Sequence, residues 1–292
     1  MIIIFLLVTT LAVTSIILYK VLNTKSNYSG ANTISLLQWN THYECFVKNK
    51  DDCCSKPLTK YLYNVLDGSI DFANLSMFEL ATFSTPTGYS IIDQYSDKPA
   101  FECGYDITTL VYNNTKWTPV GNPIYGCLNP KPDRAFIIQQ FKNISTGFDV
   151  YIIGAHMDHP VGKQLYPLTS VQVLAAALAK NGIGQSSNVI LLADTNDANP
   201  DTPTPDSTFM NGILGGTAKN VQGAGANPTC CCSDGTFPFK TDRIISNFGA
   251  SAGPAKIVDL KTIFGAMAQC PSPGSSCVLG EMHKPVFWSL SF

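Results

Sequence analysis

The sequence predicts an α/β fold with many strands. Two observations predict it: short apolar runs alternate with polar loops from Thr33 onward, and two or three segments among them have the pattern of helices. No internal repeat is present. A chain of 292 residues can hold one large domain or two small ones, and the even spread of apolar and charged residues does not separate these options.

The strands are predicted where runs of β-branched, aromatic and other apolar residues are bounded by polar or turn-forming residues. In chain order these runs are residues 34–39, 72–80, 107–112, 135–141, 150–155, 189–193, 243–247 and 286–292. Helices are predicted at residues 58–66 and at residues 170–180, whose Ala/Leu-rich pattern stops at Asn181-Gly182. The Pro-, Gly- and Asn-rich segment 199–240 is predicted to be a surface excursion with at most short structure.

The first stretch of the chain, residues 2–19, is almost wholly apolar and is followed by Lys20 and Lys25. Its length is close to the roughly 18–20 residues that span a bilayer. It lacks the basic stretch that precedes the apolar run of a signal peptide, so an uncleaved anchor is favoured over a removed signal segment. The expected organisation is an N-terminal transmembrane anchor or signal segment, a linker and one domain, over residues 1–20, 21–32 and 33–292.

Cysteines and glycosylation sequons favour an oxidising setting outside the cytosol. The chain has 10 cysteines, and sequons begin at Asn27, Asn74, Asn113 and Asn143. Asn74 lies in a run that reads as a buried strand, so we expect it to be unmodified. No Cys-x-x-Cys pair is matched by a second pair or by suitably spaced histidines, which favours disulfides over zinc. Lysines lie only on the C-terminal side of the apolar stretch, and this alone would keep the domain in the cytosol. The cysteines outweigh it, and we predict a membrane-anchored extracytoplasmic domain or a secreted one.

The charge of the chain excludes one mode of nucleic-acid binding. The formal net charge is -2, so no basic field over the whole surface would hold a polyanion by releasing its counterions. Any nucleic acid must therefore be bound locally.

Several predicted strands are followed by polar residues of types that bind metals or phosphates. In chain order these residues are Asn40, Glu79, His156, Asp194 with Asn196, and His283, which precedes the last strand. Apolar strands that deliver such side chains predict a convergent polar site at one edge of a sheet.

These residues lie in motifs that resemble those of the endonuclease/exonuclease/phosphatase superfamily, the family of pancreatic-type deoxyribonuclease. The motifs keep the family's order from residue 33 to 292, and they are Gln38-Trp39-Asn40, Ser76-Met77-Phe78-Glu79, Gly154-Ala155-His156, Ala193-Asp194-Thr195-Asn196-Asp197, Asp242-Arg243-Ile244 and His283-Lys284-Pro285-Val286. The resemblance implies a deoxyribonuclease I-like, four-layer α/β/β/α sandwich of two mixed β-sheets flanked by helices.

The resemblance also implies acid–base roles. His283 would deprotonate the attacking water, and Asp242 would orient its imidazole and stabilise the protonated form. His156 would contact the phosphate or protonate the leaving group, with Asp106 as its carboxylate partner. His159, three positions later, is interpreted as a loop or surface residue that could also line the site.

The remaining implied residues bind the cation and the phosphate. Glu79 would hold Mg²⁺, Mn²⁺ or Ca²⁺, which are hard cations that prefer carboxylate oxygens. Asp194, Asn196 and Asn40 would position the phosphate, the water or a second ion. Arg134 would make a forked contact with the phosphate.

Met282 departs from the family pattern, in which an aspartate precedes the terminal histidine and helps to bind metal. A neutral thioether does not replace a carboxylate for Mg²⁺, so Glu281 is the nearest substitute ligand. The first hypothesis is a divalent-metal-dependent phosphodiesterase that acts as a monomer on nucleic acid or another phosphodiester. Within this class a nuclease is favoured. Two alternatives stay open: a phospholipid or sphingomyelin phosphodiesterase near the membrane, and a catalytically impaired member that serves as a binding or structural module.

Overall fold

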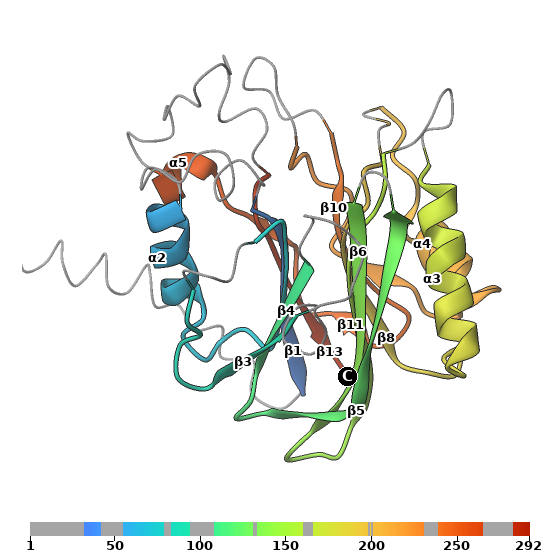
Figure 1. Ribbon diagram of the computed structural model, residues 1–292, viewed down its shortest axis with the longest axis horizontal. Coiled ribbons are helices and arrows are strands. Elements are labelled where there is room, and N and C mark those ends of the chain that lie inside the picture. The colour runs from blue at the N-terminus through green and yellow to red at the C-terminus, as the bar shows by residue number, and fades with distance from the viewer. Residues whose placement is uncertain are drawn as a thin grey trace, which may run out of the picture. The chain divides into compact units, whose positions relative to one another are not determined.

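Two mixed β-sheets make up the unit Thr33–Phe292. The structure is a computed structural model that describes residues 32–41, 55–78, 83–93, 108–130, 133–159, 166–197, 199, 201–230, 239–264 and 283–292. The two sheets lie side by side between helices on either side (Figure 1). The four-layer sandwich implied by the resemblance is therefore confirmed.

The first sheet has the strand order β11-β13-β1-β2-β4-β3, with β12 paired to β13. Its strands are β1 (Thr33–Asn40), β2 (Phe72–Ser76), β3 (Tyr89–Asp93), β4 (Thr108–Asn113), β11 (Ala250–Ser251), β12 (Lys256–Ile257) and β13 (Val286–Ser291). β1 and β2 are parallel and the helix α2 (Ser55–Val65) lies between them in the chain, whereas the other pairs are antiparallel. β1 and β2 therefore run in the same direction, and parallel strands of this kind need a crossover connection such as α2.

The second sheet repeats this plan in the order β5-β6-β7-β8-β10-β9. Its strands are β5 (Trp117–Pro130), β6 (Asp133–Asn143), β7 (Asp149–His156), β8 (Val189–Asp194), β9 (Gln222–Gly223) and β10 (Asp242–Ser246). β7 and β8 are parallel and are connected through α3 (Leu168–Lys180), and the other pairs are antiparallel. Each sheet thus contains one βαβ unit at its centre.

Three apolar cores separate the four layers. One lies between the first sheet and the helices α2 and α5 (Leu260–Phe264), and a second lies between the second sheet and the helices α3 and α4 (Asp206–Leu214). The third fills the space between the sheets with side chains such as Leu36, Phe141, Ile152 and Trp288. Strands in this position are buried on both faces, and this explains why β2, β4, β8 and β10 are buried along their whole length.

One expectation about the segment 199–240 is wrong. Residues 206–214 form the helix α4, which buries Phe209, Met210, Ile213 and Leu214 against α3 and the second sheet. The helix is fixed by Arg243, whose guanidinium lies 2.9 Å from Asp206 and 3.0 Å from Asp197. Arg243 points to this side because successive side chains alternate along β10, so its neighbour Asp242 faces the space between the sheets.

The described residues bear on three of the sequence expectations. None of the described helices is long and apolar enough to cross a membrane, and the predicted anchor, residues 1–20, lies outside the described ranges. Asn74 is fully buried, as expected for an unmodified residue, whereas Asn143 is half-buried at the end of β6. Cys127 and Cys230 are disulfide-bonded.

Gly154 in β7 permits the two sheets to approach. A Cβ at this position would lie 2.5 Å from Asn74 Oδ1 and 2.6 Å from Leu110 Cδ2, which belong to the opposite sheet. We expect Gly154→Ala to lower the free energy of unfolding by about 1–3 kcal/mol, because the core must shift to accept a methyl group. Urea denaturation measures this. Gly184→Ala is the matched control, since no atom lies within 4 Å of its added Cβ, and equal stability of the two variants would contradict the close approach.

Candidate active site

Five strands bring polar residues to one edge of the sandwich. The parallel strands β1, β7 and β8 end there in Asn40, His156 and Asp194. β10 runs antiparallel to β8 and begins at the same edge, with Asp242 opposite Asp194, and His283 stands just before β13. The two sheets meet at this edge, because Asn40 Nδ2 of the first sheet donates to Asp194 Oδ2 of the second over 2.8 Å.

His283 and Asp242 form a buried hydrogen-bonded pair. His283 Nδ1 lies 2.7 Å from Asp242 Oδ2, and neither residue is more than 4% exposed. A carboxylate accepts hydrogen bonds, so Nδ1 carries the proton and Nε2 is the nitrogen that can take one up. The backbone is held as well, because Trp39 Nε1 donates to the carbonyl oxygen of His283 over 2.8 Å. This is the arrangement that the sequence predicted for these two residues.

Asp194 lies at the centre of the site between two histidines. Its Oδ2 is 3.3 Å from His156 Nε2 and 3.7 Å from His283 Nδ1, and its Oδ1 accepts from the backbone N–H of Asn196. Burial alone would raise the pKa of Asp194, but the charges of His283 and His156 and the hydrogen bonds outweigh burial. The pKa is held well below its usual range, so Asp194 is ionised at neutral pH.

The same charges act in reverse on His283. Burial by itself lowers the pKa of this imidazole, but the carboxylates of Asp242 and Asp194 outweigh it and raise the pKa to about 8, from an ordinary 6.5. A histidine with a raised pKa stabilises the folded state in its protonated form. This contribution is complete below pH 6.5 and is lost as the pH rises through about 8.

Two residues with left-handed backbone flank the site. Asn196 has φ 49° and Met77, just after β2, has φ 59°. Such a conformation costs energy for most residues other than glycine, less so for asparagine, and residues that adopt it cluster at functional sites. Asn196 is fixed there by its side chain, whose Nδ2 donates to the carbonyl of Met157 over 2.7 Å.

Arg134 and His159 lie within electrostatic reach of the site. Arg134, at the start of β6, is buried, and its charge lowers the pKa of both His159 and His283. The pKa of His159 is lowered first by burial, then by Arg134, and it also responds to Asp194 and His156. His159 is an exposed loop residue, as predicted, and its interactions with Arg134, Asp194 and His156 agree with the expectation that it could also line the site.

The structure brings together most of the predicted residues that it describes. Asn40, Asp194, His156, Asp242 and His283 are linked by the contacts given above, with Asn196 bound to Asp194. The other predicted residues, Glu79, Asp106 and Glu281, lie outside the described residues, as does Met282.

Comparisons with known proteins agree on the fold. No family model and no curated protein matches the sequence. An endonuclease/exonuclease/phosphatase from Bacteroides vulgatus aligns with a TM-score of 0.58 and 14% identity, over 89% of this chain and 98% of that one. D. rerio TDP2 complexed with single strand DNA product aligns with a TM-score of 0.54 and 16% identity, over 88% and 98%. A mannosyl-6-phosphatase from Bacteroides thetaiotaomicron aligns with a TM-score of 0.54 and 14% identity, over 89% and 100%.

The chain has the endonuclease/exonuclease/phosphatase fold. The resemblance drawn from the motifs is therefore confirmed at the level of the fold. Within this endonuclease/exonuclease/phosphatase fold, the buried pairs described above occupy the edge where the strands of both sheets end or begin.

Asp194, Asp242 and His283 are the described groups nearest to a metal-binding set, with ligand atoms within 4.8 Å of one another. They do not fit Mg²⁺ as arranged, because Asp242 Oδ2 and His283 Nδ1 are hydrogen-bonded to each other and Mg²⁺ prefers an all-oxygen set. This cluster is a histidine held between two carboxylates. The carboxylates predicted for the cation, Glu79 and Glu281, lie outside the described residues.

Asp242→Asn tests the cause of the raised pKa of His283. An amide carries no charge, so the attraction that outweighs burial is weakened, and we expect the pKa of His283 to fall from about 8 toward or below 6.5. NMR titration of the imidazole gives the value. The exposed Asp201→Asn is the control and should leave it unchanged, and a pKa that stays near 8 in Asp242→Asn would contradict the assignment.

Proposed function

We propose that this protein is a divalent-cation-dependent phosphodiesterase, most specifically a nuclease, with His283 as its general base. The observation that supports this most directly is the buried pair of His283 Nδ1 and Asp242 Oδ2, 2.7 Å apart, beside the ionised Asp194. Hydrolysis of a phosphodiester needs a base to activate water and cationic or hydrogen-bonding groups to stabilise the charge on the phosphate. The described residues supply groups of both kinds.

In the proposed reaction, His283 Nε2 takes a proton from the attacking water. Asp242 holds the ring in the required tautomer and stabilises the imidazolium that results. Asn40 and Asn196 fix the carboxylate of Asp194, which in turn lies against His156 and His283. Arg134 would make a forked contact with the phosphate. His156 would contact the phosphate or protonate the leaving oxygen.

We assign the cation to Glu79, as the resemblance implies, with Mg²⁺ as the first choice and Mn²⁺ or Ca²⁺ as alternatives. Bound near the phosphate, a divalent ion supplies a Lewis acid that offsets the charge developed during hydrolysis. In the sequence Glu79 comes three residues after Ser76, the last residue of β2, and Ser76 lies opposite Asn40 in the parallel pair β1 and β2.

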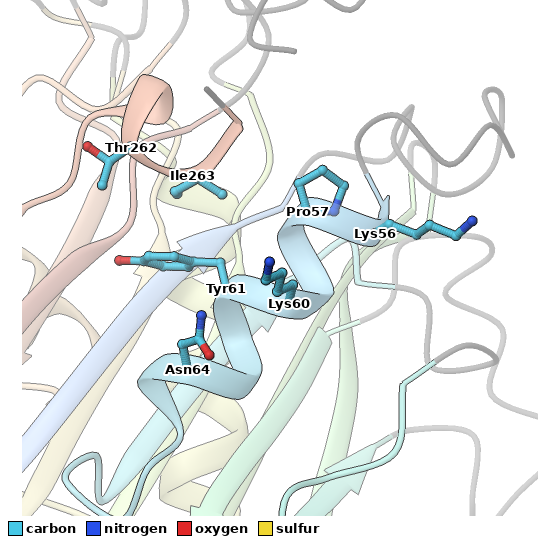
Figure 2. A pocket seen from close by; sticks show the side chains of 7 residues that line it. All are labelled: Lys56, Pro57, Lys60, Tyr61, Asn64, Thr262 and Ile263. Carbon is cyan, nitrogen blue, oxygen red and sulfur yellow. The ribbon is translucent and has the colours of Figure 1, made fainter. Parts of the chain in front are cut away.

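A hollow between α2 and α5 supports a polyanionic substrate. It has a volume of about 490 Å³ and is lined by Lys56, Pro57, Lys60, Tyr61, Asn64, Thr262 and Ile263 of α2 and α5 (Figure 2). Two of these residues are cationic and none is acidic. The Tyr61 ring packs edge-on to Trp39 at 5.8 Å, and Trp39 holds the backbone of His283. Two lysines in this hollow favour an anionic substrate that extends beyond the buried residues, and TDP2 complexed with single strand DNA product has a similar fold.

Met282 favours a second candidate, a catalytically impaired protein that binds a partner through the same fold. The departure removes a carboxylate that the family uses for metal. The buried pair of His283 and Asp242 favours the enzyme. Burying two carboxylates and two histidines together costs folding free energy, which a module that only binds a partner has no need to spend.

His283→Ala separates these two candidates. With purified full-length protein, Mg²⁺ and labelled single-stranded DNA, we expect cleavage by the wild type, loss of at least about 10²-fold on substitution, and loss of all cleavage with EDTA. Lys180→Ala, at the exposed end of α3, is the control and should cleave like the wild type. Cleavage that survives His283→Ala would refute the mechanism, and a wild type inert toward DNA and simple phosphodiesters would favour the binding module.

We also infer an oxidising location, with the domain outside the cytosol behind an N-terminal anchor. The disulfide bonds of Cys127 and Cys230 support this inference, because such bonds are rare in the cytosol. Thiol titration of the protein isolated without reductant should find these two cysteines blocked and should find them reactive after reduction. Ten free thiols in the unreduced protein would reverse the inference.

A further inference from the structure

Two amide side chains that received no catalytic role lead from the interior to Asp242. Gln38 in β1 and Asn74 in β2 are both completely buried between the sheets. Asn74 Nδ2 donates to Gln38 Oε1 over 2.8 Å, and Gln38 Nε2 donates to Asp242 Oδ1 over 3.2 Å. Both residues face the space between the sheets because β1 and β2 are parallel and in register, with Gln38 opposite Asn74.

The orientation of this amide pair is set by the backbone of the second sheet. Asn74 Nδ2 also donates to the carbonyl oxygen of Leu192 in β8 over 3.1 Å. A backbone carbonyl only accepts, so the NH₂ group of Asn74 must face it. The oxygen of Gln38 then faces that NH₂ group, and the NH₂ group of Gln38 is directed to Asp242.

This orientation has a cost that a purely structural pair would avoid. Asn74 Oδ1 receives no hydrogen bond from the described residues, and it packs where a side chain on Gly154 would otherwise lie. A buried carbonyl oxygen without a donor destabilises the fold. Apolar residues would fill the same space without this penalty, and breaks in local rules are expected at functional sites.

The benefit falls on Asp242. In the described part of the chain, its Oδ1 accepts a side-chain hydrogen bond from Gln38, whereas its Oδ2 faces His283 Nδ1 and the hydroxyl of Thr241. With Oδ1 held, the carboxylate cannot rotate, and Oδ2 stays directed at the imidazole. At metal sites, mutation of residues that only orient a ligand changes metal affinity or activity by about 10–100-fold, and we expect an effect of similar size here.

We propose that Asn74 and Gln38 form an amide relay that orients Asp242 and, through it, the general base His283. The relay consists of Leu192 O, Asn74, Gln38 and Asp242 in that order. Both amides are positioning residues, because neither reaches the place where a phosphate would bind. The proposal rests on the proposed function for its effect on rate, but its effect on the hydrogen bond of His283 is independent of any activity.

Gln38→Met tests the relay, because it keeps the volume and removes both polar groups. We expect kcat for the single-stranded DNA substrate to fall about 10–100-fold with KM unchanged within about twofold. We also expect the downfield ¹H NMR signal of His283 Nδ1–H to shift or broaden in the protein without substrate. Gln139→Met is the matched control: Gln139 is another buried glutamine, in β6, and among the described residues its Nε2 donates to the backbone carbonyls of Val120 and Gln140.

A second variant acts from a distance. Asn74→Asp replaces the donor with an acceptor facing Leu192 O and Gln38, so Gln38 would turn its NH₂ group away from Asp242. We expect the same changes in kcat and in the His283 signal, and a Gln38→Met/Asn74→Asp double variant no worse than Gln38→Met, because the two belong to one chain of bonds. Should Gln38→Met not fold, Gln38→Asn, which keeps a buried amide but is too short by one methylene, carries the same expectation.

The two readouts distinguish the relay from the enzyme. A shifted His283 signal in a protein that cleaves nothing would refute the proposed function and leave the relay standing. A His283 signal and a kcat in Gln38→Met that equal those of Gln139→Met would overturn the relay.

Discussion

The burial of two carboxylates at the meeting edge of the sheets is the constraint on which the rest of the structure depends. Asp194 and Asp242 are both 0% exposed. A buried charge is tolerated only if opposite charge or hydrogen-bond donors surround it. The surrounding groups here are His156, His283 and the amides of Asn40 and Gln38. These described polar residues therefore compensate the two buried charges.

The topology explains why these groups meet. Each sheet has a central βαβ unit, and the carboxyl ends of parallel strands lie at one edge. Packing the two sheets face to face brings both edges together, so Asn40 of one unit meets Asp194 of the other. Antiparallel neighbours then contribute from their beginnings, as Asp242 does at the start of β10. The site is thus a consequence of pairing two similar units. The helices α2 and α3 outside the sheets are the crossover connections of these units.

The sequence predicted what local pattern encodes and missed what packing decides. The strands with continuous apolar runs were found because burial on both faces leaves that pattern. β5 was missed because Pro119, Gly121 and Pro123 interrupt it, which an edge strand with irregular register tolerates. α4 was missed because prolines and glycines surround its four buried apolar residues.

The site shows the same division. The motifs identified Asp194, Asp242 and His283, since each stands at a strand end with a recognisable neighbour. Gln38 was visible in a motif but had no assigned role, and Asn74 was expected to be an unmodified residue of a buried strand. The hydrogen bond of Gln38 to Asp242 joins positions 204 residues apart and forms only when one sheet packs on the other. No local pattern records it.

One proton links the stability of this site to its chemistry. Protonated His283 compensates the charges of Asp194 and Asp242, and this stabilisation persists up to its pKa of about 8. A general base must instead be unprotonated, so at neutral pH only about a tenth of the molecules hold it ready, one pH unit below that pKa. Arg134 opposes the carboxylates by lowering the pKa of His283. Arg134 therefore has two effects in the proposed reaction. It attracts the phosphate, and by lowering the pKa of His283 it increases the fraction of His283 that is unprotonated at neutral pH.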